Sequence, residues 1–428
     1  MTESKESSLN SILPADWEIL PFKSVYKTSK GLSITKADLV EKGVPVINYG
    51  QIHSKTSTFF DSCNLPFVPQ SYLNESARLE RGDIVFADTS EDINGSGNFS
   101  IKDSDEIILA GYHNVIAKPI KEVNYRWIGY VLESSLFKSQ IQSKVKGVKV
   151  FSITQRMINN TKIWLPPKEI QKKIIDVLDN NTAFIDEIIK KTQASIAKLK
   201  LYKQSIVTEA LTKGHNRDVH LKSSGIEWAK QIPENWSTVK MKRLFSITKI
   251  IANSNEFDVL SVTQQGLKIK DLDANKGQYS NDYSKYQIVK PGYFVMNHMD
   301  LLTGWVDYSK YEGVTSPDYR VFKIVEANFV FPAYYLYLFQ MLYTNKIFYG
   351  SGQGVSSLGR WRLQTDKFNN FYIPLPPYEE QVEIAEYLQK ELLRIDNLLE
   401  KKQLLIEKFE TYKKSLIYEY VTGKKAVE

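Results

Sequence analysis

The chain has 428 residues, enough for two to four domains with separate hydrophobic cores. Hydrophobic residues make up 42% and charged residues 25%, as in soluble globular proteins, and a net charge of +7 is compatible with a nucleic-acid partner without requiring one. The single cysteine, Cys63, excludes an internal disulfide framework and indicates a reducing cytosol.

Export and membrane insertion are not expected. The first residues, MTESKESSLN, are polar and lack the apolar core of a signal peptide. The longest apolar run, 329–343, is interrupted by Pro332 and Gln340 and is shorter than the ~20 residues that span a bilayer. The histidines are scattered and match no metal-ligand spacing. We therefore expect a cytoplasmic location, with no metal and no cofactor bound by this chain.

Two globular segments alternate with two long helices in the predicted order of the chain. Each globular segment opens with a Pro-x-x-Trp step, at Pro14 to Trp17 and at Pro233 to Trp236. The predicted boundaries are an N-terminal tail at 1–15, a first globular segment (head 1) at 16–164, a first helical region at 165–214, a linker at 215–232, a second globular segment (head 2) at 233–374, a second helical region at 375–424 and a C-terminal tail at 425–428.

Each predicted helix follows a Leu-Pro-Pro step, in LPPKEIQ and LPPYEEQ, with Glu169 or Glu379 in its first turn. Apolar residues then recur at alternating three- and four-residue steps, which is typical of a heptad seam. Gly214 and Gly423 are the expected C-terminal caps. The residues predicted to pack the two helices on each other are Ile185, Ile188, Ile196, Leu199, Tyr202, Ile206, Ile395, Leu398, Leu405, Phe409, Tyr412 and Leu416.

A long helix with one apolar stripe requires a surface that covers the stripe. One alternative is a coiled coil that joins two chains. Two matched helices in one chain cover both stripes most simply by packing on each other, and antiparallel packing then gives a pseudo-twofold axis. The predicted fold class is therefore two α/β (α+β) heads joined by an antiparallel two-helix coiled coil.

The second half of the chain repeats the first. Residues 165–212 align without a gap on 375–422, with a constant shift of 210 (375 − 165 = 210), and 18 of the 48 pairs are identical. The heads match only in outline, as in GDIVFADTS (82–90) and GYFVMNHMD (292–300) at the same shift. A shared scaffold with different head surfaces is expected where each head recognises something different.

These features resemble the specificity (S) subunit of type I restriction-modification systems. The resemblance covers essentially the whole chain and rests on the duplication, the paired LPP-x-E-x-Q motifs, the Thr-Gly ends and the Pro-x-x-Trp openings. It implies two target-recognition domains, each binding one half of a bipartite double-stranded DNA site, on helices that space them and dock two modification (M) subunits. It also implies that S-adenosylmethionine, ATP and Mg²⁺ belong to the M and restriction (R) subunits. Lys168 and Ile170 depart from the pattern of the second copy, which leaves only local docking detail open.

No catalytic site is expected in the chain. Pro376-Pro377-Tyr378 resembles the end of an adenine methyltransferase motif, but Leu375 replaces the required Asn or Asp. The loop at 350–354 follows a helical segment and lacks the Lys-Ser/Thr of a phosphate-binding loop. Two alternatives to an S subunit remain at this point, a self-contained adenine DNA methyltransferase and a coiled-coil scaffold with two protein-binding heads.

DNA contacts are expected from polar and basic residues in the loops that differ between the heads. Such side chains neutralise phosphates or present paired donors and acceptors to base edges. The candidates in and around the glycine-containing loops are Lys144, Lys146, Lys149, Gln155, Arg156, Arg360, Trp361 and Arg362. Those in the matched loops are Gln51, Gln264, Gln265, Asn297 and His298.

Overall fold

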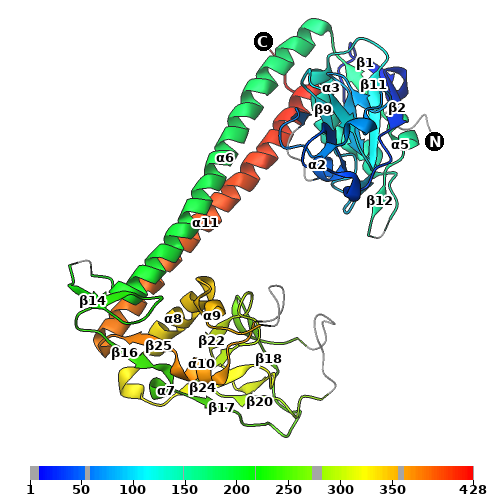
Figure 1. Ribbon diagram of the computed structural model, residues 1–428. Helices are drawn as coiled ribbons and strands as arrows, with labels where there is room; N and C mark the ends of the chain where they lie inside the picture. Colours follow the sequence, from blue (N-terminus) through cyan, green and yellow to red (C-terminus); the bar gives the residue numbers. More distant parts are fainter. Residues whose placement is uncertain are drawn as a thin grey trace. The chain divides into compact units, whose positions relative to one another are not determined.

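The protein forms two compact units that each contain one head and parts of both long helices (Figure 1). The computed structural model describes residues 9–53, 58–147, 149–216, 218–271, 282–354 and 361–427. Unit 1 comprises Met1–Thr192 and Leu404–Glu428, and unit 2 comprises Gln193–Gln403. The long helices are α6 (Lys168–Lys213) and α11 (Tyr378–Val421), and neither is interrupted.

Head 1 is built on two mixed sheets. The larger has the strand order β2-β11-β7-β9-β4 and the smaller β5-β3-β10-β6, and each contains one parallel pair. Its strands are β1 (Glu18–Pro21), β2 (Tyr26–Lys30), β3 (Val44–Ile47), β4 (Phe59–Phe60), β5 (Phe67–Val68), β6 (Arg78–Leu79), β7 (Ile84–Ala87), β8 (Thr89–Ser90), β9 (Phe99–Lys102), β10 (Ile108–Ala110), β11 (Asn114–Pro119), β12 (Phe151–Ser152) and β13 (Lys162–Leu165). Its helices are α2 (Tyr49–His53), α3 (Tyr125–Glu133), α4 (Ser135–Gln142) and α5 (Gln155–Asn159), with 3-10 turns at Phe22–Ser24, Lys36–Asp38 and Gln70–Tyr72.

Head 2 is built on one four-stranded antiparallel sheet, β17-β24-β21-β22, flanked by two-stranded pairs. The strands of unit 2 are β14 (Leu221–Ser223), β15 (Gln231–Pro233), β16 (Ser237–Lys240), β17 (Phe245–Thr248), β18 (Leu260–Thr263), β19 (Gly266–Ile269), β20 (Gln287–Val289), β21 (Tyr293–Met296), β22 (Val306–Tyr308), β23 (Gly313–Thr315), β24 (Arg320–Ile324) and β25 (Tyr372–Leu375). Its shorter helices are α7 (Met241–Leu244), α8 (Pro332–Thr344), α9 (Ile347–Gly350) and α10 (Thr365–Asn370), with a 3-10 turn at Ala327–Phe329.

The two heads share a three-stranded core. β2-β11-β7 and β17-β24-β21 have the same order, and in each the middle strand pairs antiparallel with both neighbours. Gly82 and Gly292 stand 210 residues apart just before β7 and β21, and both adopt a positive φ, 88° and 89°. The duplication therefore extends through the heads, although their sequences diverge outside this core.

The Leu-Pro-Pro motif ends a strand and starts a long helix in each copy. The recurring glutamine closes this step, because Gln171 Nε2 donates to Pro166 O at 2.8 Å and Gln381 Nε2 donates to Pro376 O at 2.9 Å. The departure of the first copy also has a structural cause. Glu380 accepts a hydrogen bond from the indole of Trp236, whereas Ile170 at the equivalent position packs on the apolar core of unit 1.

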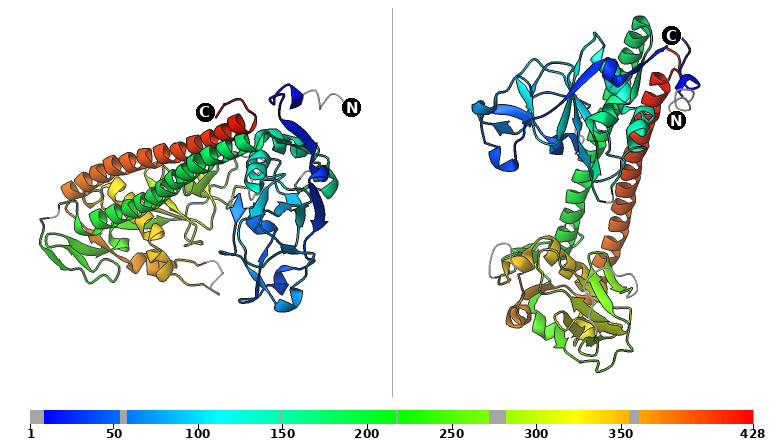
Figure 2. Two further views of the ribbon diagram at one scale, coloured as in Figure 1. Left: turned by 90° about the horizontal axis from the view of Figure 1, so that it is seen from above. Right: turned by 90° about the vertical axis from the view of Figure 1, so that its right-hand side faces the viewer.

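The long helices pair antiparallel, as predicted. In unit 1 the start of α6 lies beside the end of α11, and in unit 2 the end of α6 lies beside the start of α11 (Figures 1 and 2). The buried and half-buried seam follows alternating four- and three-residue steps in both helices. It consists of Ile185, Ile189, Thr192, Ile196, Leu199, Lys203, Ile206 and Ala210 in α6 and of Ile395, Leu399, Lys402, Ile406, Phe409, Lys413, Leu416 and Tyr420 in α11.

The predicted seam was wrong at several positions. Tyr202 and Tyr412 are 55% and 53% exposed, and Leu398 and Leu405 are also exposed, while Ile188 lies half-buried at the flank. The seam positions next to the two tyrosines are lysines, whose stems are half-buried. The ammonium groups pair across the seam, Lys203 with Asp396 at 2.5 Å in unit 2 and Lys413 with Asp186 at 2.7 Å in unit 1. A search for apolar residues alone therefore selected the neighbouring tyrosines.

Each head binds the end of the long helix that belongs to the other copy. Trp164 Nε1 of head 1 donates to Val421 O at 2.5 Å, and Tyr334 Oη of head 2 donates to Leu211 O at 3.2 Å. Leu211 and Val421 are equivalent, 210 residues apart. The glycines that follow, Gly214 and Gly423, adopt positive φ angles of 80° and 68°, which confirms them as helix caps. Both sequence copies are therefore needed to complete either unit.

Candidate nucleic-acid interface

The two heads assemble the predicted contact residues on equivalent parts of the shared core. In head 2 the strand β21 leads into the loop 297–305, to which a later segment is hydrogen-bonded. Leu363 N donates to His298 O at 3.0 Å and Leu301 N donates to Trp361 O at 3.2 Å. The structure thereby brings Asn297 and His298 together with Trp361 and Arg362, although more than 60 residues separate them in the sequence.

Head 1 has the same arrangement with a short strand pair. β12 pairs antiparallel with β8, directly after β7, and Ile153 N donates to Asp88 O at 2.7 Å. Lys146 and Lys149 are exposed in the loop before β12, and Arg156 is exposed in α5 after it. The predicted basic segment of head 1 is therefore held beside the loop that follows β7.

The side chains of the remaining candidates of head 1 form hydrogen bonds with other residues of the same head. Lys144 Nζ donates to Asn160 O at 3.4 Å, and Gln155 Oε1 accepts from Thr28 Oγ1 at 3.4 Å. Gln51 lies in α2, and its Oε1 accepts from Asn48 N at 3.0 Å. Gln51 thus closes the first turn of its own helix, and its contact with DNA stays a prediction.

Three residues beside the loop after β7 were not predicted from the sequence, namely Tyr49, Asp88 and His113. The Tyr49 ring lies 6.5 Å from the His113 ring, and His113 Nδ1 is 3.1 Å from a carboxylate oxygen of Asp88. His113 has a φ of 55°, which is rare for a residue other than glycine and marks a backbone held in a special conformation. The pKa of Tyr49 is raised, first by burial and then by the nearby Glu91 carboxylate. No sequence pattern marks this cluster, because tertiary contacts alone assemble it.

In head 2 the candidates Trp361 and Arg362 are held by residues 349–354. Gln353 and Arg362 exchange two backbone hydrogen bonds of 3.0 Å, which leaves the side chain of Arg362 exposed. Trp361 packs against Tyr349 with ring centroids 4.6 Å apart. A Cβ atom on Gly354 would lie 2.9 Å from the Trp361 ring, so any other residue there would force the ring to move. Arg360 lies outside the described residues.

The glutamine and asparagine candidates of head 2 surround the same loop. Gln264, in the turn between β18 and β19, donates to Thr303 O at 3.3 Å, while Gln265 accepts from Lys268 Nζ at 2.6 Å. Asn297 is half-buried, and its Oδ1 accepts from Met299 N at 3.3 Å. Gln264 and Gln265 are exposed and stand at the edge of the loop 297–305.

His298 is not a surface contact in this structure, contrary to the prediction. Its side chain is 7% exposed, and its pKa is lowered to about 3 by burial and, to a smaller extent, by the charges of Arg320 and Arg362. Arg320, which the sequence did not single out, is buried beneath the segment 361–365. Its guanidinium donates to Leu363 O at 2.9 Å and lies 4.5 Å from the centre of the Phe368 ring. Arg320 therefore supports the backbone that presents Trp361 and Arg362.

The described residues contain no group of three or more His, Cys, Asp and Glu side chains placed to hold a metal ion. In the same part of the chain, no helix is long and apolar enough to cross a membrane. The Leu-Pro-Pro-Tyr segment forms the passage from β25 to α11, and the loop 350–354 follows α9 and pairs with Arg362 through Gln353. Both segments, which were considered above as possible catalytic motifs, have structural roles.

Sequence comparison finds the same family twice in the chain. The family described as the type I restriction modification DNA specificity domain matches residues 14–198 and 233–408. The putative type I restriction enzyme MjaX specificity subunit of Methanocaldococcus jannaschii is 26% identical over 409 residues, covering 90% of this chain and 88% of that protein. The EcoKI specificity subunit of Escherichia coli K12 is 25% identical over 203 residues, covering 46% and 43%.

Solved structures show the same fold along the whole chain. A chain from a study of complex assembly and conformational transition in a type I restriction-modification system superposes with a TM-score of 0.69 at 14% identity, covering 96% of this chain and 99% of that chain. The HsdS subunit from Thermoanaerobacter tengcongensis gives a TM-score of 0.50 at 14% identity, covering 96% and 98%.

Proposed function

The chain belongs to the type I restriction-modification DNA specificity family and is a DNA-recognition specificity subunit, and from this premise we propose that each head reads one part of a two-part DNA site. One observation supports the two-part site above all others. The heads build their candidate surfaces at equivalent places on the shared core, beside the loop after β7 and the loop after β21, but from different residues. Equivalent placement gives both heads the same approach to DNA, and different residues give them different sequences to recognise.

The chemistry of the two surfaces predicts different contacts. Head 2 presents the guanidinium of Arg362 and the amides of Gln264 and Gln265, and such groups pair with two atoms of a purine edge in the major groove. Head 1 presents Lys146, Lys149 and Arg156 next to a cluster that contains Asp88. We propose that these cations contact phosphates, whereas Asp88 accepts from a cytosine or adenine amino group.

We further propose that the long helices dock one modification subunit on each half of the chain. Four residues of each long helix are identical in the two copies, lie at least partly outside the core and do not pack in the seam between the helices. They follow steps of four, three and four residues on one side of each helix, and we call them the shared stripe. The shared stripe consists of Lys198, Tyr202, Ser205 and Glu209 in unit 2 and of Lys408, Tyr412, Ser415 and Glu419 in unit 1.

The shared stripe supports docking because internal packing does not explain its identity. Tyr202 and Tyr412 each expose more than half of their surface, while 30 of the 48 aligned positions have changed (48 − 18 = 30). In unit 2 an open groove of about 430 Å³ runs beside the stripe and is lined by Ser205 and Glu209 among others. A repeated surface is expected to bind two copies of one partner.

The reaction chemistry then belongs to the partner subunits. We propose that S-adenosylmethionine, ATP and Mg²⁺ are bound by modification and restriction subunits, and that this chain alone does not methylate DNA. We propose that restriction subunits are present in the full complex and that the protein acts in the cytoplasm.

An exchange of heads tests the proposal directly. Residues 16–164 are replaced by the first head of another specificity subunit, and the chimera is assembled with its modification subunits. DNA selected from a random pool is then sequenced for the chimera and for the parent complex. One part of the recognised site is expected to change while the other stays the same. A change in both parts, or in neither, would show that the heads do not act separately.

A further inference from the structure

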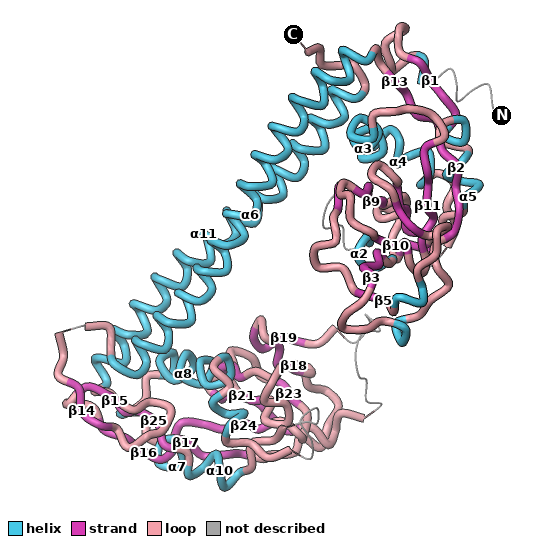
Figure 3. Tube along the Cα trace, turned by 45° about the horizontal axis from the view of Figure 1, so that its top comes forward, coloured by secondary structure: helices cyan, strands magenta, loops and turns pink. Residues whose placement is uncertain are grey.

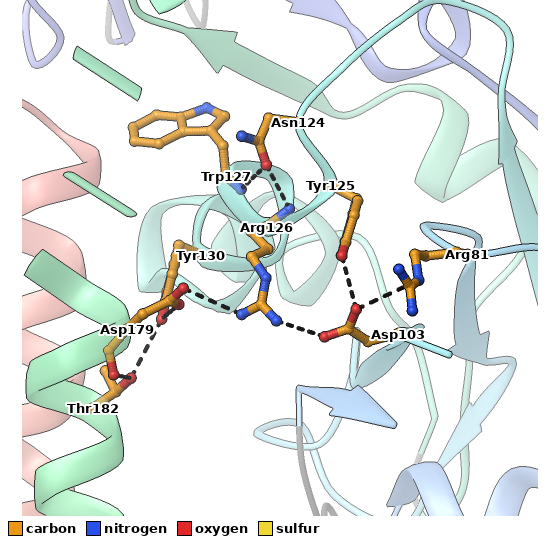
Figure 4. A network of polar contacts seen from close by, with 9 residues as sticks. All are labelled: Arg81, Asp103, Asn124, Tyr125, Arg126, Trp127, Tyr130, Asp179 and Thr182. Atoms are coloured by element: carbon orange, nitrogen blue, oxygen red, sulfur yellow. Dashed lines mark hydrogen bonds and ion pairs between the residues drawn. The ribbon is translucent and has the colours of Figure 1, made fainter. Parts of the chain in front are cut away.

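A charged network attaches head 1 to the long helix within unit 1 (Figure 4). Arg126 is the second residue of α3, and the guanidinium bridges two carboxylates. Its Nη2 lies 2.6 Å from Asp103 Oδ2 in head 1, and its Nη1 lies 3.2 Å from Asp179 Oδ2 on α6. α3 lies between the strands of head 1 and α6 (Figure 3), so Arg126 spans the junction between head and helix.

The second oxygen of Asp179 is also held by head 1. Tyr130, one turn further along α3, donates from its hydroxyl to Asp179 Oδ1 at 2.6 Å, and the same hydroxyl lies 3.3 Å from Thr182 Oγ1. The start of α3 is itself fixed, because Asn124 Oδ1 accepts from the backbone nitrogens of Arg126 and Trp127. Residues from two successive turns of α3 therefore bind both oxygens of one carboxylate on α6. Charge-assisted hydrogen bonds are directional, so they fix the angle of α3 on α6 as well as the contact between them.

This attachment belongs to head 1 and not to the repeated scaffold. The positions equivalent to Asp179 and Thr182 in α11 are Gln389 and Leu392, which carry no charge. Head 2 is attached to α11 differently, through Gln381, which accepts from Phe331 N at 2.8 Å and donates to Phe329 O at 2.9 Å. Asp179, which has a lower helix propensity than most residues, is thus explained by its use as an attachment point.

We propose that Arg126 and Asp179 are positioning residues that fix the angle of head 1 on α6 and thereby restrict the gap length that the protein accepts between the two parts of its DNA site. This inference rests on the proposed two-part recognition. Neither residue needs to touch DNA. Loss of the network leaves the base-reading surface of head 1 intact and lets the head rock on the helix, so DNA sites with neighbouring gap lengths become acceptable.

The test uses the full chain assembled with its modification subunits. Arg126→Met removes the bridge, and Asp179→Asn removes the charge but keeps an oxygen that accepts from Tyr130. Gln389→Ala changes the equivalent position of the second copy and is the matched control. Binding is measured to duplexes that keep both specified parts and change the gap by one or two base pairs in either direction. A second pool keeps the gap and randomises the specified bases.

Preference for the best gap over its neighbours is expected to fall about threefold to tenfold in Arg126→Met and Asp179→Asn, the range of one typical hydrogen bond. Gln389→Ala is expected to keep the parent gap profile, and all variants are expected to keep the parent base preferences. A general loss of stability lowers binding equally at every gap, so an unchanged relative profile would overturn the proposal. A changed base preference in either part would also overturn it.

If Arg126→Met does not assemble, Asp179→Asn still tests the proposal, because asparagine is a neutral isostere of aspartate and preserves the packing. Arg126→Lys gives a graded check, since one ammonium group cannot bridge both carboxylates in the geometry of the guanidinium. Its gap preference is expected to lie between those of the parent and Arg126→Met. If the parent complex recognised one continuous sequence, the proposed function itself would fail, and this inference with it.

Discussion

Replacement of Tyr202 by alanine is expected to remove one modification subunit from the complex and to leave the free chain folded. Tyr202 is 55% exposed in unit 2, so truncation removes little internal packing. A tyrosine has roughly 200 Å² of surface to bury. Docking on the exposed part therefore removes on the order of 100 Å² from water, which is worth about 2.5 kcal/mol at 25 cal/mol per Å². That energy corresponds to about a 60-fold weaker Kd, in the range of an interface hot spot.

The assay is native mass spectrometry of the chain titrated with its modification subunit, combined with calorimetry for each variant. The parent is expected to bind two copies, and Tyr202→Ala and Tyr412→Ala are each expected to bind one copy tightly. The double variant is expected to bind both copies weakly. Phe184→Ala is the control, because Phe184 is 63% exposed on α6 outside the shared stripe and is Arg394 in the other copy. Equal losses for Phe184→Ala and Tyr202→Ala, or a single subunit bound by the parent at saturation, would refute the role of the shared stripe.

Two further predictions concern head 2. His298 has a folded pKa of about 3 against about 6.5 unfolded, so its contribution to stability is complete above pH 6.5 and is lost as the pH falls toward 3. At pH 5 the free energy of unfolding has fallen by about 2 kcal/mol, at about 1.36 kcal/mol per pH unit below 6.5. His298→Gln is expected to remove that part of the pH dependence, as measured by denaturant unfolding. An identical pH profile for variant and parent would contradict the burial of a neutral histidine. Gly354→Ala places a Cβ against the Trp361 ring and is expected to weaken discrimination at the head 2 part of the site while the head 1 part is unaffected, as measured by sequencing of selected DNA. Gly350→Ala is the control, because nothing lies within 4 Å of a Cβ atom there, and an equal effect of both substitutions would count against a role of the Trp361 ring.

The scaffold was largely predictable from the sequence because it is repeated. Identical residues at a constant shift located both long helices, and the need to cover two apolar stripes predicted the antiparallel pairing that the structure contains. The phase of the seam was not predictable from apolar residues, because Lys203 and Lys413 occupy seam positions and are balanced by Asp396 and Asp186 from the opposite helix. Such a pair becomes visible only when both helices are aligned in opposite directions.

The candidate surfaces were predictable only in part. Basic and aromatic residues in divergent loops, such as Arg156, Trp361 and Arg362, could be nominated because DNA contacts require these side-chain types. His113 and Arg320 could not, since the position of each depends on hydrogen bonds between segments far apart in the chain. His298 was misplaced for the same reason: it is buried where its backbone pairs with Leu363, far along the chain.

The two-part site is the central claim, and the sequence selected from random DNA by the complex of this chain with its modification subunits tests it most directly. The expected result is two specified parts of a few base pairs each, different from one another, separated by an unspecified gap of roughly half to one helical turn, about 5–10 base pairs. A single continuous recognised sequence, or two identical parts, would contradict the account.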